Sequence, residues 1–150
     1  MPTLAETLRT HLTAAMRAKD DAVTRTLRMT LTALTNESVS GKVARELTDD
    51  EVLAVVTKEA KKRREAAEAF TGAGRGELAD RELEEAAVLD RYLPTQLTDA
   101  ELTDLVAAAV ASTGASGPRA IGVVMKELSG KTAGRADGGR VSAEVRRQLG

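Results

Sequence analysis

Three capping boxes constrain the fold of this chain more than any other feature of its sequence. A threonine is followed three residues later by a glutamate at Thr3–Glu6, Thr48–Glu51 and Thr98–Glu101. In such a box the threonine hydroxyl accepts a hydrogen bond from an amide of the first helical turn, and the glutamate accepts one from the threonine amide. Each cap stabilises its helix by about 1 kcal/mol. The three boxes therefore mark three helix starts and predict an all-α protein.

Apolar residues at helical spacing predict further helices between and after these starts. Leu4, Leu8, Leu12 and Met16 recur every four residues, as expected for one face of a helix. Pro94 ends the fourth helix, because the residue before a proline is driven out of the α conformation. The predicted helices cover about residues 4–19, 23–37, 49–70, 77–92, 99–113, 118–129 and 140–149. We therefore expect a helical N-terminal subdomain, residues 1–95, and a three-helix C-terminal subdomain, residues 96–150.

Composition excludes several classes of protein. The chain has no cysteine and no tryptophan, and its only aromatic residues are Phe70 and Tyr92. Without cysteine there is no disulfide, no thiolate nucleophile and no cysteine-bound zinc. No apolar run reaches the roughly 18 residues that span a bilayer, and residues 1–19 do not read as a targeting peptide. We expect a cytoplasmic protein that has no membrane contact and a core of aliphatic side chains.

No motif in the sequence predicts catalysis, a metal or a cofactor. Gly130-Lys131-Thr132 looks like the end of a phosphate-binding loop, but Met125 stands where that motif needs its first glycine. His11 is the only histidine and has no neighbouring ligand residues. The carboxylates of residues 77–104 are better explained as a solvated helix face, with Arg81 and Glu85 paired four residues apart. We therefore predict no catalytic residue, no metal ligand and no cofactor.

Two basic segments remain as candidate sites, although the net charge is only −1. Residues 58–64 form the first, in which helical spacing aligns Lys58, Lys61, Lys62 and Arg64 along a strip that can follow nucleic-acid phosphates. The equally weighted alternative is a solvated helix face. Residues 134–140 form the second, where Arg135 and Arg140 flank the start of the last helix, and helix N-termini attract anions. The favoured alternative there is that Asp137 caps that helix itself.

Several short motifs resemble those of one protein family. They are Lys61-Lys62-Arg63-Arg64-Glu65-Ala66, Gly74-Arg75-Gly76-Glu77-Leu78, Tyr92-Leu93-Pro94-Thr95-Gln96-Leu97-Thr98 and Gly134-Arg135-Ala136-Asp137-Gly138. In this order they resemble the free-standing YqeY-like proteins of the GatB/YqeY family, from Leu4 to Leu149. The resemblance implies a two-part helical fold. It also implies kinship with the tail of the GatB subunit of tRNA-dependent amidotransferase and with an appendage of some glutaminyl-tRNA synthetases, both of which are tRNA-binding elements.

Three functions follow from the residues and the resemblance. The first is a non-catalytic tRNA-binding or tRNA-enzyme accessory module, whose partners are tRNA and tRNA-charging or amidotransferase enzymes. The expected tRNA-binding residues are Lys58, Lys61, Lys62, Arg64, Arg135 and Arg140. With two aromatic residues in the chain, RNA contact is expected through backbone and shape and not through stacked bases. The second is a protein–protein adaptor without RNA. The third, inherited by family name, is carbon–nitrogen ligation with glutamine as amido donor, which no residue of the chain supports.

Overall fold

A computed structural model describes all 150 residues of the chain, and it confirms the all-α prediction. Its α-helices are α1 (Leu4–Ala18), α2 (Asp21–Ser38), α3 (Asp49–Gly72), α4 (Gly76–Asp90), α5 (Asp99–Thr113), α6 (Ile121–Thr132) and α7 (Gly138–Leu149), with a 3-10 turn at Pro118–Ala120 before α6. All three capping boxes form, with both reciprocal hydrogen bonds at the starts of α1, α3 and α5. None of these helices is long and apolar enough to cross a bilayer.

The ends predicted for α6 from the sequence are wrong. We predicted that this helix begins at Pro118 and stops at Gly130, but the α-helical part begins at Ile121 and continues through Gly130 to Thr132. Buried Thr132 explains the extension, since its hydroxyl donates to the carbonyl of Leu128 inside the last turn (3.1 Å). A glycine inside a helix costs only about 1 kcal/mol relative to alanine, so packing of the following turn outweighs it.

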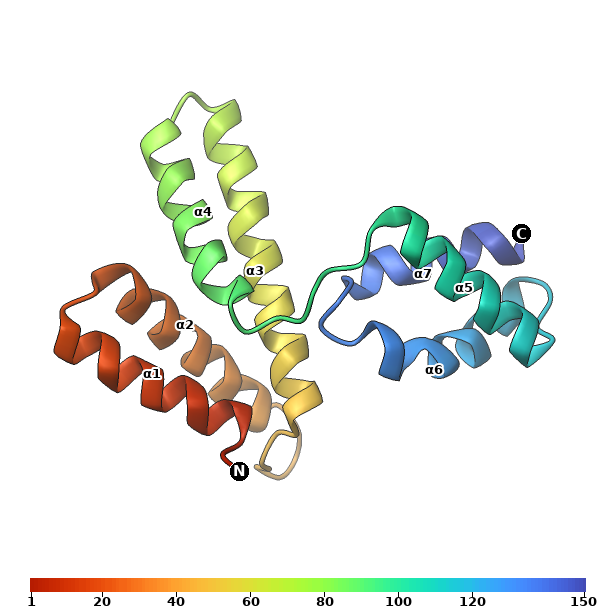
Figure 1. The fold of residues 1–150 in the computed structure, drawn as a ribbon, viewed down its shortest axis with the longest axis horizontal. Helices are drawn as coiled ribbons and strands as arrows, with labels where there is room; N and C mark the ends of the chain where they lie inside the picture. The colour runs from red at the N-terminus through yellow and green to blue at the C-terminus, as the bar shows by residue number, and fades with distance from the viewer. The chain divides into compact units, whose positions relative to one another are not determined.

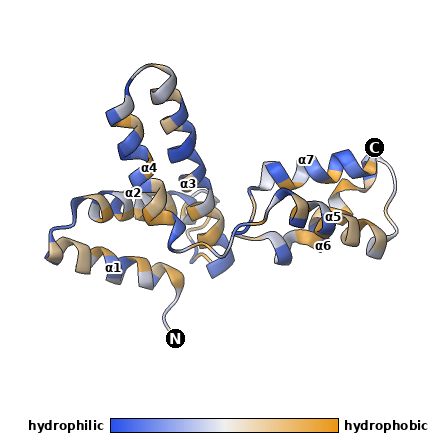
Figure 2. Ribbon diagram, turned by 45° about the horizontal axis from the view of Figure 1, so that its top comes forward, coloured by the Kyte–Doolittle hydropathy of each residue, from blue (hydrophilic) through white to orange (hydrophobic).

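The chain divides into two compact units, Met1–Leu93 and Pro94–Gly150, which are called unit 1 and unit 2 below. Unit 1 consists of two helical hairpins, α1–α2 and α3–α4 (Figure 1). Their shared core contains Leu8, Leu27, Val56 and Leu89, all with 1% exposure or less. The far end of the α3–α4 hairpin extends beyond α1 and α2 (Figure 1), and hydrophilic residues alternate there with hydrophobic ones (Figure 2). α3 therefore presents an outer face to solvent over much of its length.

The only histidine and the only tyrosine contact each other in unit 1. His11 Nδ1 lies 2.7 Å from the Tyr92 hydroxyl, and the two rings are tilted with centroids 5.6 Å apart. Tyr92 is half-buried against the apolar core, and this burial raises the pKa of its hydroxyl. The contact joins α1 to the segment that follows α4. His11 therefore makes a structural contact within unit 1.

Unit 2 is a three-helix arrangement of α5, α6 and α7 around a purely aliphatic core. Leu102, Val106, Val124, Leu128, Val141 and Val145 are all buried there. α5 ends at Gly114 in the left-handed conformation (φ 63°), which glycine adopts without the penalty that a Cβ atom brings. The short loop of residues 133–137 then leads from α6 to α7, and this loop carries part of the candidate site.

Candidate nucleic-acid interface

Three lysines of α3 form an exposed group, which we call the lysine cluster: Lys58, Lys61 and Lys62. At 3.6 residues per turn they lie within about 100° around the helix and about 6 Å along it. Lys58 has no ion pair or hydrogen bond. Lys61 lies 3.9 Å from Glu65, and Lys62 lies 3.3 Å from Glu59, both on the same helix. The Lys61–Glu65 pair is exposed, and exposed pairs contribute about 0–1 kcal/mol, so Lys61 can exchange Glu65 for another anion at little cost. Glu59 is buried, but it also pairs with Arg63 and so keeps a partner when Lys62 binds elsewhere.

Arg64 does not continue this group. It lies about 120° around α3 from Lys58, on the side nearer α4, and its guanidinium pairs with Asp90 at the end of α4. The structure therefore groups the three lysines, whereas Arg64, about 60° around the helix from Lys61, is engaged by an acidic residue of α4. The sequence treated all four as one strip, because spacing alone does not reveal which acidic residue of another helix a cation will meet.

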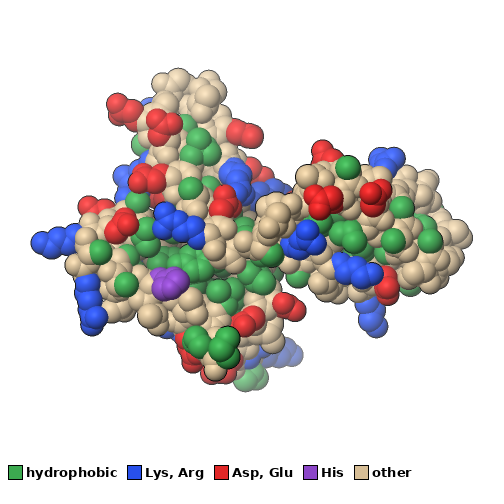
Figure 3. Space-filling model, in the orientation of Figure 1, with side chains coloured by type: hydrophobic (Ala, Val, Ile, Leu, Met, Phe, Trp, Pro, Cys, Tyr) green, Lys and Arg blue, Asp and Glu red, His purple; other side chains and the backbone are tan.

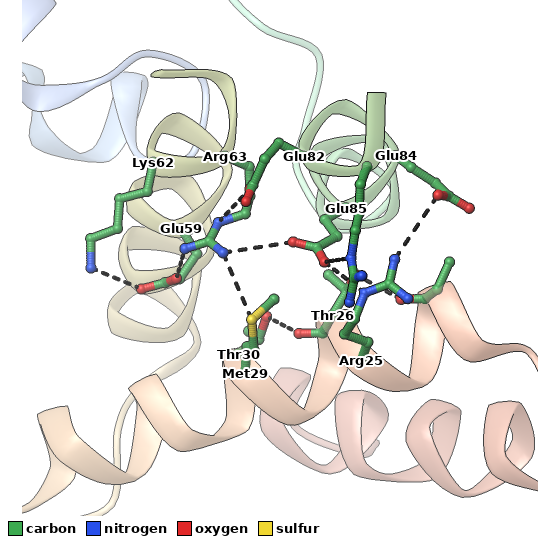
Figure 4. A network of polar contacts seen from close by, with 12 residues as sticks. Arg25, Thr26, Met29, Thr30, Glu59, Lys62, Arg63, Glu82, Glu84 and Glu85 are labelled. Atoms are coloured by element: carbon green, nitrogen blue, oxygen red, sulfur yellow. Dashed lines mark hydrogen bonds and ion pairs between the residues drawn. The ribbon is translucent and has the colours of Figure 1, made fainter. Parts of the chain in front are cut away.

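Arg63 is the basic residue of this segment that sequence reasoning left out, and it is largely buried. Its guanidinium lies 3.7 Å from Glu59, 3.6 Å from Glu82 and 3.6 Å from Glu85 (Figure 4). One of its nitrogens also donates to the sulfur of Met29 at 3.7 Å. The side chain thus points inward and joins α3 to α2 and α4, so Arg63 is a structural residue and the lysines beside it face outward.

Glu85 is the centre of this ion-pair network. Its carboxylate accepts a hydrogen bond from Nε of Arg25 on α2 (2.7 Å), and it also lies 3.9 Å from Arg81 (Figure 4). The Arg81–Glu85 pair confirms the predicted spacing. However, Glu85 is only 3% exposed, so the expectation that these carboxylates form a solvated face is wrong for this residue. A partner sixty positions away, Arg25, explains why the burial was not visible in the local sequence.

In unit 2 the two most distinctive sequence motifs bind to each other. The amide of Leu97 donates to the carbonyl of Arg135 (2.8 Å), and the Gln96 side chain donates to the carbonyl of Gly134 (2.7 Å). In return, Nε of Arg135 donates to the carbonyl of Thr95 (3.0 Å). Gly134 has φ 71°, a conformation that favours glycine. These contacts fasten the segment before α5 to the loop before α7.

Arg140 and Asp137 complete the start of α7. The Asp137 carboxylate accepts from the amide of Arg140 (3.3 Å), and Nη2 of Arg140 lies 2.8 Å from Asp99 at the start of α5. Asp137 therefore caps α7, as the favoured alternative from the sequence stated, and it occupies the place that an external anion would take. Arg135 and Arg140 keep about a third of their side chains exposed.

These motifs agree with a family comparison that covers nearly the whole chain. The family described as Yqey-like protein matches residues 5–149. The chain belongs to the YqeY-like family. A comparison with curated proteins gives no match. The contacts in unit 2 assign a physical role to two motifs of this YqeY-like protein. The segment of residues 95–97, before α5, and the loop of residues 134–135, before α7, are joined by hydrogen bonds.

Charge is mixed on the face of each unit that Figure 3 shows. Figure 3 shows Lys and Arg side chains interspersed with Asp and Glu side chains on the visible face of each unit.

The Gly130-Lys131-Thr132 segment lies in the last turn of α6, which confirms that it is no phosphate-binding loop. No group of three or more His, Cys, Asp or Glu residues is arranged to hold a metal ion. Binding of a polyanion would therefore depend on local groups such as the lysine cluster.

Proposed function

We propose that this YqeY-like protein is a non-catalytic tRNA-binding module that serves tRNA-charging or amidotransferase enzymes. The observation that carries the proposal is the lysine cluster: three exposed lysines occupy adjacent turns of one helix. Neutralising phosphates releases condensed counterions, which favours binding to the RNA backbone. The resemblance to the tail of the GatB subunit supports tRNA as the nucleic acid.

The buried network beneath the lysine cluster supports this proposal. Arg63 and Glu59 lie on the same helix as the lysines, and they tie it to Arg25 and Glu85. A helix that is fixed in this way presents its lysines without a large loss of conformational freedom on binding. In unit 2, Arg140 adds an exposed guanidinium whose partner, Asp99, is itself on the surface. Arg64 and Arg135 are also paired with surface acidic residues, Asp90 and Glu101, and each would exchange that partner for a phosphate on binding.

The absence of tryptophan and the scarcity of other aromatics define the mode of binding. Bases of single-stranded RNA are usually read by stacking on aromatic side chains, but Tyr92 is engaged with His11. The protein is therefore expected to contact phosphates of folded RNA. For such binding the logarithm of the association constant falls linearly with the logarithm of the salt concentration, with a slope of about −0.9 for each phosphate neutralised on a duplex.

A salt titration of tRNA binding tests the proposal. The test variant carries Lys58→Glu, Lys61→Glu and Lys62→Glu, and the control carries Arg17→Glu, Arg28→Glu and Arg75→Glu, three exposed arginines with no ion pair. Both variants change the net charge equally. We expect filter binding to fall steeply and the salt slope to flatten by about 3 for the test variant only. Equal losses in both variants, or no preference for tRNA over a random polyanion, would contradict the proposal.

A second candidate, a protein–protein adaptor, is favoured by the exposed side of α4. Leu83 is 50% exposed on this helix, Asp80 lies one turn before it, and neither Asp80 nor Glu77 in the first turn has an ion pair. An exposed leucine next to carboxylates suits a partner helix that carries both apolar and basic residues. The discriminating measurement is a pull-down with and without ribonuclease: a protein recovered equally in both, and lost on Leu83→Glu, would favour the adaptor over tRNA binding.

A further inference from the structure

A pocket of about 310 Å³ opens in unit 1, away from the lysine cluster. It lies where the first turns of α1, the end of α2, the segment of residues 45–47 and the start of α3 meet. Its apolar lining comes from Ala5, Leu34, Leu47 and Val52. This volume is at the lower end of the range for small-molecule sites, about 300–1,000 Å³. The size therefore suits a small metabolite and not a large cofactor.

Two of the charged residues that line the pocket are already engaged by neighbours. Glu6 accepts a hydrogen bond from the amide of Thr3 as part of the capping box of α1 (2.8 Å). Arg45 lies 2.5 Å from Glu51, and this interaction lowers the pKa of Glu51 to about 2. The backbone amide of Arg45 also donates to the carbonyl of Ser38 (3.0 Å). These contacts hold the wall of the pocket in place.

Two other charged residues of the lining have no partner. Arg9 on α1 and Glu46 in the loop before α3 both line the pocket and are exposed. Neither forms an ion pair or a side-chain hydrogen bond, with each other or with any other residue. Arg9 and Glu46 are thus the cation and the anion of the pocket that have neither an ion pair nor a hydrogen bond, and they lie beside its apolar wall without neutralising each other.

We propose that this pocket binds a free α-amino acid with an aliphatic side chain. In this arrangement Arg9 binds the carboxylate, since a guanidinium matches a carboxylate in a two-point contact. Glu46 binds the ammonium group, and the aliphatic side chain packs on Ala5 and Leu47. Both charges of the ligand are then met by a group that the protein leaves unpaired. The inference concerns a different surface from the tRNA proposal and does not depend on it.

Calorimetric titration with three related probes tests the site. The probes are leucine, N-acetylleucine, which lacks the ammonium charge, and leucinamide, which lacks the carboxylate. We expect saturable binding of leucine and affinities at least about tenfold lower for the other two, because a hydrogen bond to a charged group is worth about 1.5–3 kcal/mol. If leucine binds no more tightly than both analogues, or shows no saturation up to its solubility limit, the proposal fails.

Matched variants assign the two contacts. Arg9→Gln should weaken leucine binding about tenfold and leave the binding of leucinamide unchanged. Glu46→Gln should weaken leucine binding and leave the binding of N-acetylleucine unchanged. The controls are Arg17→Gln and Glu68→Gln, which change the same charges at exposed, unpaired positions outside the pocket. Equal weakening by the controls would overturn the site. All four residues are exposed, so the variants are expected to fold, and tRNA binding by the same samples is a separate readout.

Discussion

Unit 1 and unit 2 are both small helical bundles, but different kinds of polar contact hold their helices together. In unit 1, charged side chains from three helices meet in the interior, and Glu85 and Glu59 are buried there. In unit 2 the core contains no buried charge: the ion pair between α5 and α7, Arg140–Asp99, lies at the surface, and Gln96, Arg135 and Gln148 make long-range bonds to backbone carbonyls. Similar secondary structure therefore rests on buried charge pairs in one unit, and on surface pairs and backbone contacts in the other.

The difference matters because the two kinds of contact fail differently. A buried charge that loses its partner keeps its full desolvation cost, whereas a lost neutral hydrogen bond near the surface costs about 1 kcal/mol. Unit 1 should therefore be sensitive to single substitutions in the network that fixes α3. Unit 2 should respond mainly to changes in its aliphatic core. Four predictions test this contrast, in decreasing order of expected effect.

The largest effect is expected for Glu85→Ala in unit 1. The substitution leaves the guanidinium groups of Arg25 and Arg63 without their shared carboxylate. Breaking a buried pair by removing one partner costs about 3–5 kcal/mol. Urea unfolding followed by the fluorescence of Tyr92, the only tyrosine and a residue of unit 1, measures the loss directly.

Glu84→Ala is the matched control for this prediction. Glu84 is the neighbouring residue, lies 4.0 Å from the same Arg25, and has 59% of its side chain exposed. Its removal should cost less than about 1 kcal/mol, as for exposed pairs in general. If Glu84→Ala and Glu85→Ala lower the free energy of unfolding equally, burial is not what makes the network important, and the contrast between the units disappears.

The same residue shows where sequence reasoning reaches its limit. The caps of α1, α3 and α5 were predictable because a capping box is local: both partners lie within four residues. The burial of Glu85 was not, because Arg25 and Arg63 come from other helices. Likewise, helical spacing grouped Lys58, Lys61 and Lys62 but could not show that Arg64 turns to Asp90.

The motifs of unit 2 also show that contacts between distant segments cannot be predicted from local sequence. The sequence identified Gln96 and Arg135 as parts of distinctive motifs, but only the fold shows that the two segments bond to each other. The pocket beside Arg9 and Glu46 had no sequence signal, because residues 3–9 and residues 34–52 meet only in the folded chain. Sites that are built from one helix can thus be predicted from spacing, and sites that are built from several helices cannot.

The second prediction concerns the aliphatic core of unit 2. Leu128 is fully buried there, and Leu128→Ala should lower the stability of unit 2 by about 3 kcal/mol through lost transfer energy and a cavity. Hydrogen exchange of backbone amides should show lost protection in α5–α7 and unchanged protection in α1–α4. Equal loss of protection in both units would show that they unfold as one and would remove the basis for comparing them.

The third prediction compares two aspartate caps, one in each unit. Asp20 caps α2 by accepting from the amide of Val23, and Asp137 caps α7 by accepting from the amide of Arg140. Replacing either by alanine should cost about 1 kcal/mol, and replacement by asparagine much less. Amide exchange in the first turn of the affected helix is the measurement. A much larger cost for Asp137→Ala would indicate that its loop contacts, and not the cap alone, hold unit 2 closed.

The smallest effect is expected for two partly exposed carboxylates with strongly lowered pKa values. Hydrogen bonds from Arg45 lower the pKa of Glu51 in unit 1 to about 2, and those from Arg147 lower the pKa of Glu144 in unit 2 to about 2. An unfolded glutamate has a pKa of about 4.3. Because the folded pKa is the lower one, each pair stabilises its unit fully above about pH 5, and this stabilisation is lost as the pH falls towards 2.

Glutamine variants separate the two contributions. Glu51→Gln should flatten the fall in stability between about pH 5 and 2 for unit 1 only, and Glu144→Gln should flatten it for unit 2 only. Urea unfolding followed by amide signals of each unit in NMR spectra reports both in one sample. Salt should weaken both effects, because the arginine of each pair is exposed and its charge is screened. A different outcome is that unit 1 keeps its full acid sensitivity in Glu51→Gln while unit 2 loses acid sensitivity in Glu144→Gln. In that case the buried carboxylates around Arg63 are what make unit 1 acid-sensitive, and the contrast between the units becomes sharper.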